Sequence, residues 1–315
     1  MEPFNQSMVT HFIIKGISEV SELQLPIFFL VLLIYLITVG GNLTVLLLVC
    51  LDRHLRTPMY FFLGLLSLVD VSSATVTLHK TLFTFVSGNK TIPYASCLIQ
   101  MFCFGCFLTV ELFIITAMSY DRYVAVCYPL QYVMIMNHRA CVLLASACFI
   151  LSLFGNVPLV VLISQFSCYR SNIINHFFCD LLPILTISCS DTSLLKTLFL
   201  IEVTVFFSII PFLLTFISYV FIIAAILRIR STIGRRKAFY TCSSHLTLVI
   251  LLYATLVFQY LRPISEDTLD YNKLISLFNT AAVPILNPLI YTVKNKDVKS
   301  AFRRKLSYFQ NTFKG

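Results

Sequence analysis

The sequence has few charged residues for its length. Asp, Glu, Lys and Arg make up 12% of the 315 residues, whereas apolar residues make up 58%. Soluble globular domains contain about 25% charged residues, because their surfaces face water. The composition is therefore that of a membrane protein.

Patterns that would indicate other classes of protein are also missing. No stretch alternates apolar and polar residues with a period of two, which excludes a transmembrane β-barrel. No nucleophile with its base, phosphate-binding loop or closed set of metal ligands is present, so no enzyme and no organic cofactor are expected. Residues 1–24 lack the basic and apolar regions of a cleavable signal peptide.

Seven apolar stretches are each long enough to cross a bilayer, which needs about 20 residues of helix. Because backbone groups in lipid must satisfy one another, each stretch is predicted to be a helix. The fold class is therefore an all-α membrane protein with a seven-helix bundle. The stretches are Pro26–Cys50, Pro58–Phe85, Cys97–Met118, Ala140–Ile163, Leu198–Leu227, Phe239–Leu261 and Leu274–Val293.

The chain divides into an outer terminus at 1–24, a bundle at 25–293 and an inner tail at 294–315. In the tail, apolar residues recur at helical spacing among Lys and Arg, which predicts a short amphipathic helix on the membrane surface. The tail has no Cys, so palmitoyl anchoring there is excluded. The apolar residues are Val298, Phe302, Leu306 and Phe309.

Basic residues gather on one side of the predicted helices. With the N-terminus outside, 16 of the 23 Lys and Arg residues fall in inner segments, and most acids fall in outer ones. This distribution follows the positive-inside rule and suits an anionic inner leaflet. The net charge of +9 is thus explained by membrane lipid, and no nucleic-acid partner is expected.

Four cysteines lie on the predicted outer side, where disulfides form. They are Cys97, Cys168, Cys179 and Cys189. Four cysteines allow three connectivities, and the sequence alone does not choose between them. Sequons at Asn5 and Asn89 lie on the same side and are predicted glycosylation sites.

Two carboxyl groups lie at membrane depth, Asp70 in the second stretch and Glu111 in the third. Ionisable groups at such depth usually mark function. They could together bind a cation such as sodium, or they could be protonated and hydrogen-bonded. A metal site at His176, Cys179 and Asp180 is disfavoured, because Cys179 is a disulfide candidate and a disulfide sulfur is no thiolate ligand.

Several short motifs occur in order along the chain, each at a matching depth in a predicted helix. They are Gly41-Asn42, Pro58–Leu63, Leu66–Asp70, Met118–Leu130, Ser218-Tyr219, Lys237–Leu246 and Pro284–Tyr291. Together they resemble the motifs of vertebrate odorant receptors, which are rhodopsin-like G-protein-coupled receptors. The pattern is most similar to the tetrapod, airborne-odorant branch.

The resemblance implies disulfides Cys97–Cys179 and Cys168–Cys189, and a sodium-type pocket at Asp70 and Glu111. It also implies a stimulatory G protein, a rise in cAMP, and a plasma membrane location in the cilia of olfactory neurons. Asp121 is expected to pair with Arg122 in the resting state. The implied switch residues are Asp121, Arg122, Tyr123, Tyr219, His245, Asn287, Pro288 and Tyr291.

A ligand pocket is then expected in the outer half of the bundle, and helical spacing selects its lining. The selected residues are apolar with a few hydroxyls and no charge, which favours a small neutral odorant and disfavours an amine. They are Phe104, Gly105, Leu108, Thr109, Val203, Thr204, Phe207, Ser208, Tyr253, Leu256, Val257, Tyr260, Ser276 and Thr280.

Two alternatives remain open at this point. The same receptor fold could sense a metabolite outside the nose, which the sequence does not distinguish from smell. A channel or transporter is less favoured, because the sequence lacks inverted halves and pairs of broken helices.

Overall fold

A computed structural model of the chain describes residues 9–201, 205–206, 209–260, 269–294 and 296–312. Its helices are α1 (Ser21–Leu51), α2 (Pro58–Ser87), α3 (Tyr94–Cys127), α4 (Tyr132–Ile135), α5 (His138–Ser164), α6 (Leu181–Ile187), α7 (Ser193–Ile201), α8 (Ile210–Leu227), α9 (Thr232–Tyr260), α10 (Leu269–Lys294) and α11 (Lys296–Thr312), with a 3₁₀ turn η1 (Arg53–Leu55). Three short strands complete it, β1 (His11–Ile14), β2 (Thr91–Pro93) and β3 (Ile173–Ile174).

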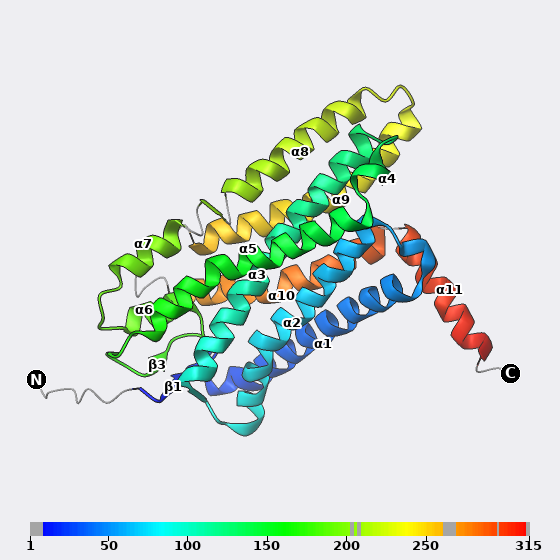
Figure 1. The fold of residues 1–315 in the computed structure, drawn as a ribbon. Coiled ribbons are helices and arrows are strands. Elements are labelled where there is room, and N and C mark those ends of the chain that lie inside the picture. Colours follow the sequence, from blue (N-terminus) through cyan, green and yellow to red (C-terminus); the bar gives the residue numbers. More distant parts are fainter. Residues whose placement is uncertain (1–8, 202–204, 207–208, 261–268, 295, 313–315) are drawn as a thin grey trace, which may run out of the picture.

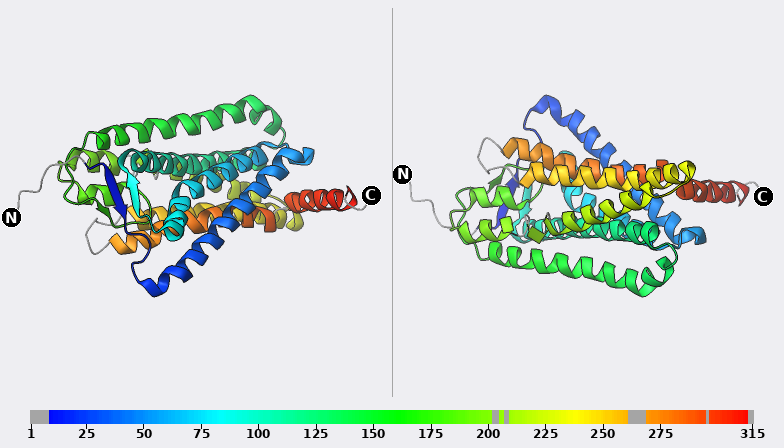
Figure 2. Two further views of the ribbon diagram at one scale, coloured as in Figure 1. Left: turned by 90° about the horizontal axis from the view of Figure 1, so that it is seen from below. Right: turned by 90° about the horizontal axis from the view of Figure 1, so that it is seen from above.

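Seven helices of the described chain are long and apolar enough to cross a membrane, which confirms the predicted seven-helix bundle. They are α1, α2, α3, α5, α8, α9 and α10, and they run along a common direction (Figure 1). α3 packs against α2, α5 and α8, and therefore lies at the centre of the bundle. Figure 2 shows β1 and α11 at opposite ends of the bundle, with α11 extending beyond it. We call the end with β1 the outer end and the end with α4 and α11 the inner end.

A three-stranded sheet at the outer end was not predicted. β1 lies in the middle, antiparallel to β2 and parallel to β3, with His11 opposite Pro93 and Ile13 opposite Ile173. The sheet joins the N-terminal segment to the loop after α2 and to the long loop between α5 and α8. Phe12 of β1 is fully buried and packs edge-on against Tyr169, so the outer loops have a small core of their own.

Within the fifth apolar stretch, predicted as Leu198–Leu227, the structure describes the end of α7, residues 205–206 and α8. α7 ends at Ile201 and α8 begins at Ile210, with Pro211 in its first turn. Proline is favoured at this position because the first turn of a helix needs no backbone donor there. α6 and the start of α7 precede this stretch, so the segment after α5 contains helical structure that the apolar pattern does not indicate.

The contact between α1 and α10 explains the Gly41-Asn42 pair. Pro288 has no N–H, so the carbonyl group of Pro284 loses its donor within α10. The Asn42 side-chain amide donates to that carbonyl oxygen at 2.8 Å. A Cβ atom on Gly41 would lie 3.2 Å from the Pro288 ring, so glycine lets the two helices approach this closely.

Polar contacts fasten α11 to the inner end of the bundle. Arg304 donates to Asp52 at 2.7 Å, and Tyr60 donates to Asp297 at 3.1 Å. Burial alone would raise the pKa of Asp52, but hydrogen bonds from Arg304 and His54 outweigh it and hold the pKa at about 2. The amphipathic helix is thereby tied to the turn between α1 and α2.

Candidate functional site

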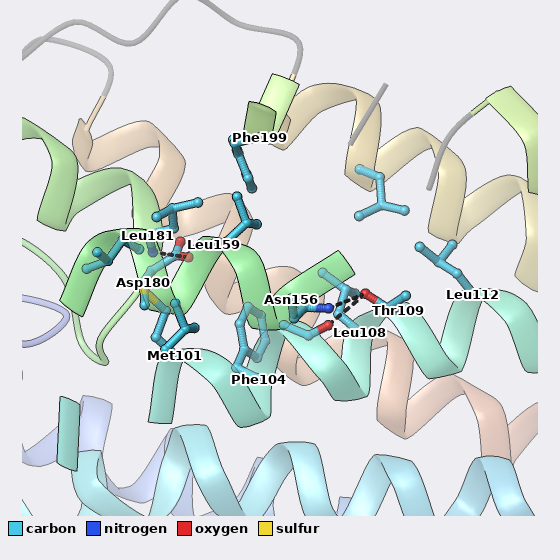
Figure 3. A pocket seen from close by; sticks show the side chains of 14 residues that line it. Met101, Phe104, Leu108, Thr109, Leu112, Asn156, Leu159, Asp180, Leu181 and Phe199 are labelled. Atoms are coloured by element: carbon cyan, nitrogen blue, oxygen red, sulfur yellow. Dashed lines mark hydrogen bonds between the residues drawn. The ribbon is translucent and has the colours of Figure 1, made fainter. Parts of the chain in front are cut away.

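A cavity lies in the outer half of the bundle, between α3, α5 and the long loop (Figure 3). Its walls are mainly apolar, with polar groups at two places. The lining residues are Met101, Phe104, Gly105, Leu108, Thr109 and Leu112 of α3, Asn156, Leu159, Val160 and Ile163 of α5, Asp180, Leu181 and Phe199 of the long loop, and Leu256 of α9. Such a lining suits a small, mostly apolar molecule held by few hydrogen bonds.

Asn156 and Thr109 form the polar group in the middle of the cavity. The Asn156 amide donates to the Thr109 hydroxyl at 3.2 Å and to the carbonyl of Ser152 at 2.9 Å, and Thr109 donates to the carbonyl of Gly105 at 2.8 Å. A Cβ atom on Gly105 would collide with the Asn156 side chain. The glycine therefore makes room for Asn156 to reach the wall formed by α3.

Asp180 supplies the second polar group, nearer the outer end. Its side chain is only 7% exposed, and one carboxylate oxygen accepts a hydrogen bond from the Leu181 N–H at 2.8 Å, which caps α6. Burial raises the pKa of Asp180 to about 6. The lining selected by helical spacing came from the long helices and had no charged group at its centre, whereas Asp180 reaches the cavity from the loop.

Five of the residues selected by helical spacing line this cavity: Phe104, Gly105, Leu108, Thr109 and Leu256. Four lining residues of the cavity come from α5, whereas the predicted lining came from α3, the fifth apolar stretch, α9 and α10. Ser276, Thr280 and Tyr253 are buried outside its lining, and Tyr253 packs edge-on against Phe212. Val257 was predicted to line the pocket, but it is 45% exposed on the outside of α9. The rotation of the helix turns Leu256 toward the cavity instead.

Other selected residues lie outside what the structure describes. They are Val203, Thr204, Phe207 and Ser208, together with the side chain of Tyr260. The prediction also missed the whole contribution of α5. Asn156, a polar residue inside an apolar stretch, was the signal that could have pointed to it.

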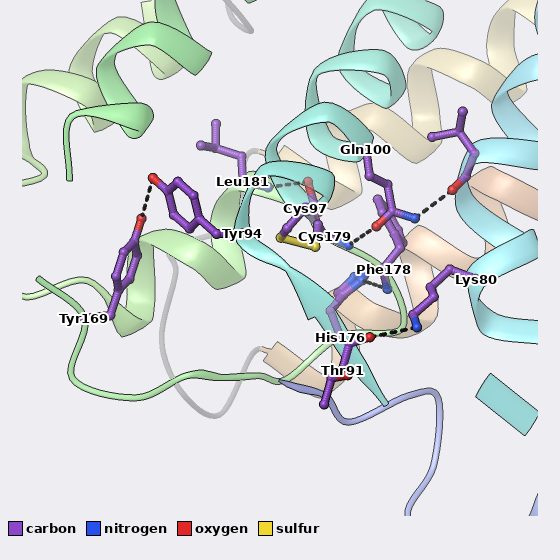
Figure 4. Close-up of a disulfide and its surroundings, with 12 residues drawn as sticks. Lys80, Thr91, Tyr94, Cys97, Gln100, Tyr169, His176, Phe178, Cys179 and Leu181 are labelled. Carbon is purple, nitrogen blue, oxygen red and sulfur yellow. Dashed lines mark hydrogen bonds between the residues drawn. A yellow bond between two sulfur atoms is a disulfide. The ribbon is translucent and has the colours of Figure 1, made fainter. Parts of the chain in front are cut away.

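The long loop covers the cavity and is anchored to α3 by a disulfide between Cys179 and Cys97 (Figure 4). A second disulfide joins Cys168 to Cys189 within the loop. Both pairings are those that the family resemblance implies. Beside the first, Gln100 accepts a hydrogen bond from the Cys179 N–H at 2.9 Å and donates to the carbonyl of Val76 at 2.7 Å. The residue next to Asp180 is therefore held in place from both α2 and α3.

Further contacts fix the loop to α2 and α10. Thr81 donates to the carbonyl of Phe177 at 3.0 Å, and Lys273 donates to Asn175 at 2.8 Å. His176 is 2% exposed, stacks on Phe177 and meets Phe178 edge-on. Burial lowers the pKa of His176 to about 3, so the ring is neutral and serves as part of the packed lid.

Asp70 and Glu111 converge at depth beneath the cavity, as the resemblance implies. The Asn287 amide donates to Asp70 at 2.9 Å and to Glu111 at 3.4 Å, which links α2, α3 and α10. One oxygen of Asp70 and the amide oxygen of Asn287 have no hydrogen-bond partner among the described residues. Buried oxygens left in this way fit the ligand preference of a hard cation such as sodium.

At the inner end, Tyr219 and His245 are buried together, with the Tyr219 hydroxyl 2.7 Å from His245 Nδ1. The expected pairing of Asp121 with Arg122 is not found among the described residues. The buried carboxylate of Asp121 instead accepts a hydrogen bond from the Tyr132 hydroxyl of α4 at 2.8 Å.

The remaining predicted switch residues are placed only in part. The ring of Tyr123 packs against Phe221 of α8, with centroids 5.8 Å apart, whereas the side chain of Tyr291 is outside the described part of the structure. Pro288 lies inside α10 against Gly41. At the inner end, α3 contacts α4 through Asp121 and Tyr132, and α8 contacts α9 through Tyr219 and His245.

Of the two predicted glycosylation sites, Asn5 is outside the described residues. Asn89 is exposed at the outer end, and its side-chain oxygen accepts hydrogen bonds from the N–H and the hydroxyl of Thr91. The sequon is thus accessible on the face that the topology predicts.

Comparison with known proteins assigns the family. The family model described as "Olfactory receptor" matches residues 31–308, nearly the whole chain. The chain belongs to the olfactory receptor family. It is 45% identical to human olfactory receptor 8D1 over 96% of the chain and 98% of that protein, and 43% identical to mouse olfactory receptor 8U3 over 100% and 98%. It is therefore a G-protein-coupled receptor and not an enzyme.

Proposed function

We propose that this olfactory receptor binds a small, largely apolar, neutral odorant in the cavity under the long loop and activates a stimulatory G protein, which raises cAMP. The observation that carries the proposal is the cavity itself. It joins apolar walls from α3 and α5 to two isolated polar groups, and its lid is fastened to three helices.

Odorant binding and G-protein activation are linked through α3. The upper part of this helix lines the cavity from Met101 to Leu112, and its lower part carries Asp121-Arg122-Tyr123. A ligand that prefers one arrangement of α3 against α5 and α9 shifts the population of the inner end. Release of Asp121 from Tyr132, with movement of Tyr219 and His245, would then open a site for the G protein.

We infer that the N-terminus and the lid lie outside the cell. Basic residues at the inner end favour the cytoplasmic leaflet, and α11 carries Lys299, Arg303 and Lys305 beside its apolar positions. Anionic lipid is accordingly a partner of α11. We assign the receptor to the plasma membrane, in the cilia of olfactory sensory neurons.

Sodium is proposed as an ion of the resting state at Asp70 and Glu111. The unpartnered oxygens of Asp70 and Asn287 are the groups that would hold it. A bound cation there would bridge α2, α3 and α10, and would stabilise the arrangement in which Asn287 contacts both carboxyl groups.

The test is an odorant screen in cells with a cAMP readout and measured surface expression. An agonist of the wild type should give no cAMP response with Arg122→Ala, because Arg122 is one of the proposed switch residues at the inner end of α3. Arg139→Ala, at the exposed start of α5, is the matched control and should respond normally. A full response of Arg122→Ala would remove the proposed coupling mechanism.

A further inference from the structure

Asp180 is a buried acid that caps α6 and also lines the cavity. Its carboxylate is 7% exposed and accepts a hydrogen bond from its neighbour Leu181. Among the described residues that line the cavity, no other is charged. Figure 3 shows the side chain at the end of the cavity near Met101 and Leu181. A buried carboxylate with unused acceptor capacity is costly, and a hydrogen-bond donor brought by a ligand would offset that cost.

The middle of the cavity also offers acceptors rather than donors. Both amide hydrogens of Asn156 are used, one by Ser152 and one by Thr109. The hydroxyl hydrogen of Thr109 is donated to Gly105. The oxygen atoms of these side chains can still accept hydrogen bonds. Neither this pair nor the Asp180 carboxylate therefore offers a hydrogen-bond donor to a ligand.

We propose that Asp180 determines ligand specificity by accepting a hydrogen bond from the hydroxyl group of an alcohol. Alcohols are then preferred to ketones of the same carbon skeleton. This inference rests on the proposed odorant-binding function and adds to it the class of polar group that the ligand carries.

The ionisation of Asp180 supports this preference. Burial raises its pKa to about 6, so at about pH 7 the carboxylate form still dominates. A carboxylate only accepts hydrogen bonds. A ketone also only accepts, so its oxygen beside Asp180 would be left unpaired and repelled, whereas an alcohol turns its hydrogen toward the carboxylate.

Asp180→Asn separates this role from the structural one. Asp and Asn are equally good residues at the N-cap of a helix, so the variant keeps the cap of α6. It removes the charge and adds an amide that can donate to a ketone. Asp191→Asn is the matched control, because Asp191 is an exposed acid of the same loop and its carboxylate accepts hydrogen bonds from Ser193 at the start of α7.

The experiment measures cAMP dose–response curves for alcohols, each paired with its ketone, such as menthol with menthone and cyclooctanol with cyclooctanone. In the wild type, the alcohols should act at concentrations roughly tenfold lower than their ketones, since a hydrogen bond to a charged group is among the strong ones. Asp180→Asn should raise the half-maximal concentration of the alcohols roughly tenfold and leave that of the ketones unchanged or lower. Asp191→Asn should change neither.

The inference is overturned if no alcohol in the panel activates the receptor, or if Asp180→Asn shifts alcohols and ketones equally at matched surface expression. In the second case the odorant response itself persists, so the proposed function stands and only the role of Asp180 falls. If wild-type receptor at the cell surface gives no cAMP with odorants of any class, the proposed function fails as well.

Discussion

Asn42 of α1 donates a hydrogen bond to the carbonyl oxygen of Pro284 in α10, the group whose helical donor Pro288 removes. In lipid, a backbone carbonyl without a donor is costly. We therefore expect Asn42→Leu to lower the free energy of unfolding by about 1–3 kcal/mol. Thermal unfolding of the purified receptor measures this. Thr44→Val is the control, because Thr44 only bonds back to its own helix, and equal melting temperatures for both variants would contradict the account.

The disulfide between Cys97 and Cys179 holds the lid beside the cavity across 82 residues of sequence. Cys97→Ser should sharply reduce surface delivery, since loss of such a bond typically costs about 2–5 kcal/mol in small domains. Cys50→Ser, at an exposed free cysteine, should be delivered normally. Mass mapping of thiols in the mature receptor provides the direct check, and a free thiol at Cys97 or Cys179 would refute the pairing.

The raised pKa of Asp180 predicts how stability depends on pH. The folded value of about 6 exceeds the ordinary 3.8, so the protonated form favours folding. Its contribution is complete below the ordinary pKa and is lost as pH rises through about 6. Between about pH 5 and pH 7, the free energy of unfolding of the wild type should fall by about 1 kcal/mol more than that of Asp180→Asn. Melting temperatures of both proteins at the two pH values measure this, and parallel pH profiles would show that Asp180 does not titrate there.

A salt experiment distinguishes the two hypotheses for Asp70 and Glu111, which are a bound sodium ion and protonated, hydrogen-bonded carboxyl groups. If sodium binds there, replacing choline chloride by sodium chloride at equal ionic strength should stabilise the wild type and raise its melting temperature. At a sodium concentration ten times the dissociation constant, the free energy of unfolding should increase by about 1.4 kcal/mol. Asp70→Asn should abolish this gain, because it removes the carboxylate that carries the unpartnered oxygen. The same melting temperature in both salts would favour protonated, hydrogen-bonded carboxyl groups.

The bundle could be predicted from the sequence because each span needs only length and apolar composition. The small outer sheet could not, because its strands have two to four residues and show no usable periodicity. Helical spacing grouped Leu108 with Phe104 on one face of α3, and both line the cavity. It did not fix the rotation of α9, where Leu256 faces the cavity and Val257 the outside.

The polar groups of the cavity could not be predicted from the sequence for a different reason. Asp180 follows a cysteine in a loop, and it reaches the cavity because the bond to Cys97 and the contact with Gln100 place that loop over α3. Asn156 depends on the absence of a side chain at Gly105. Both are tertiary relationships between distant segments, which no local pattern encodes.

The most direct test of the account compares two neighbouring valines of α5. Val160 lines the cavity, whereas Val161 is 50% exposed on the outside of the helix. Cyclic AMP dose–response curves for a wild-type agonist, at matched surface expression, should show a loss of potency of roughly tenfold or more for Val160→Phe, because the larger ring occupies ligand space. Val161→Phe should match the wild type. Unchanged potency in Val160→Phe, or an equal loss in both variants, would contradict the assignment of this cavity as the odorant site.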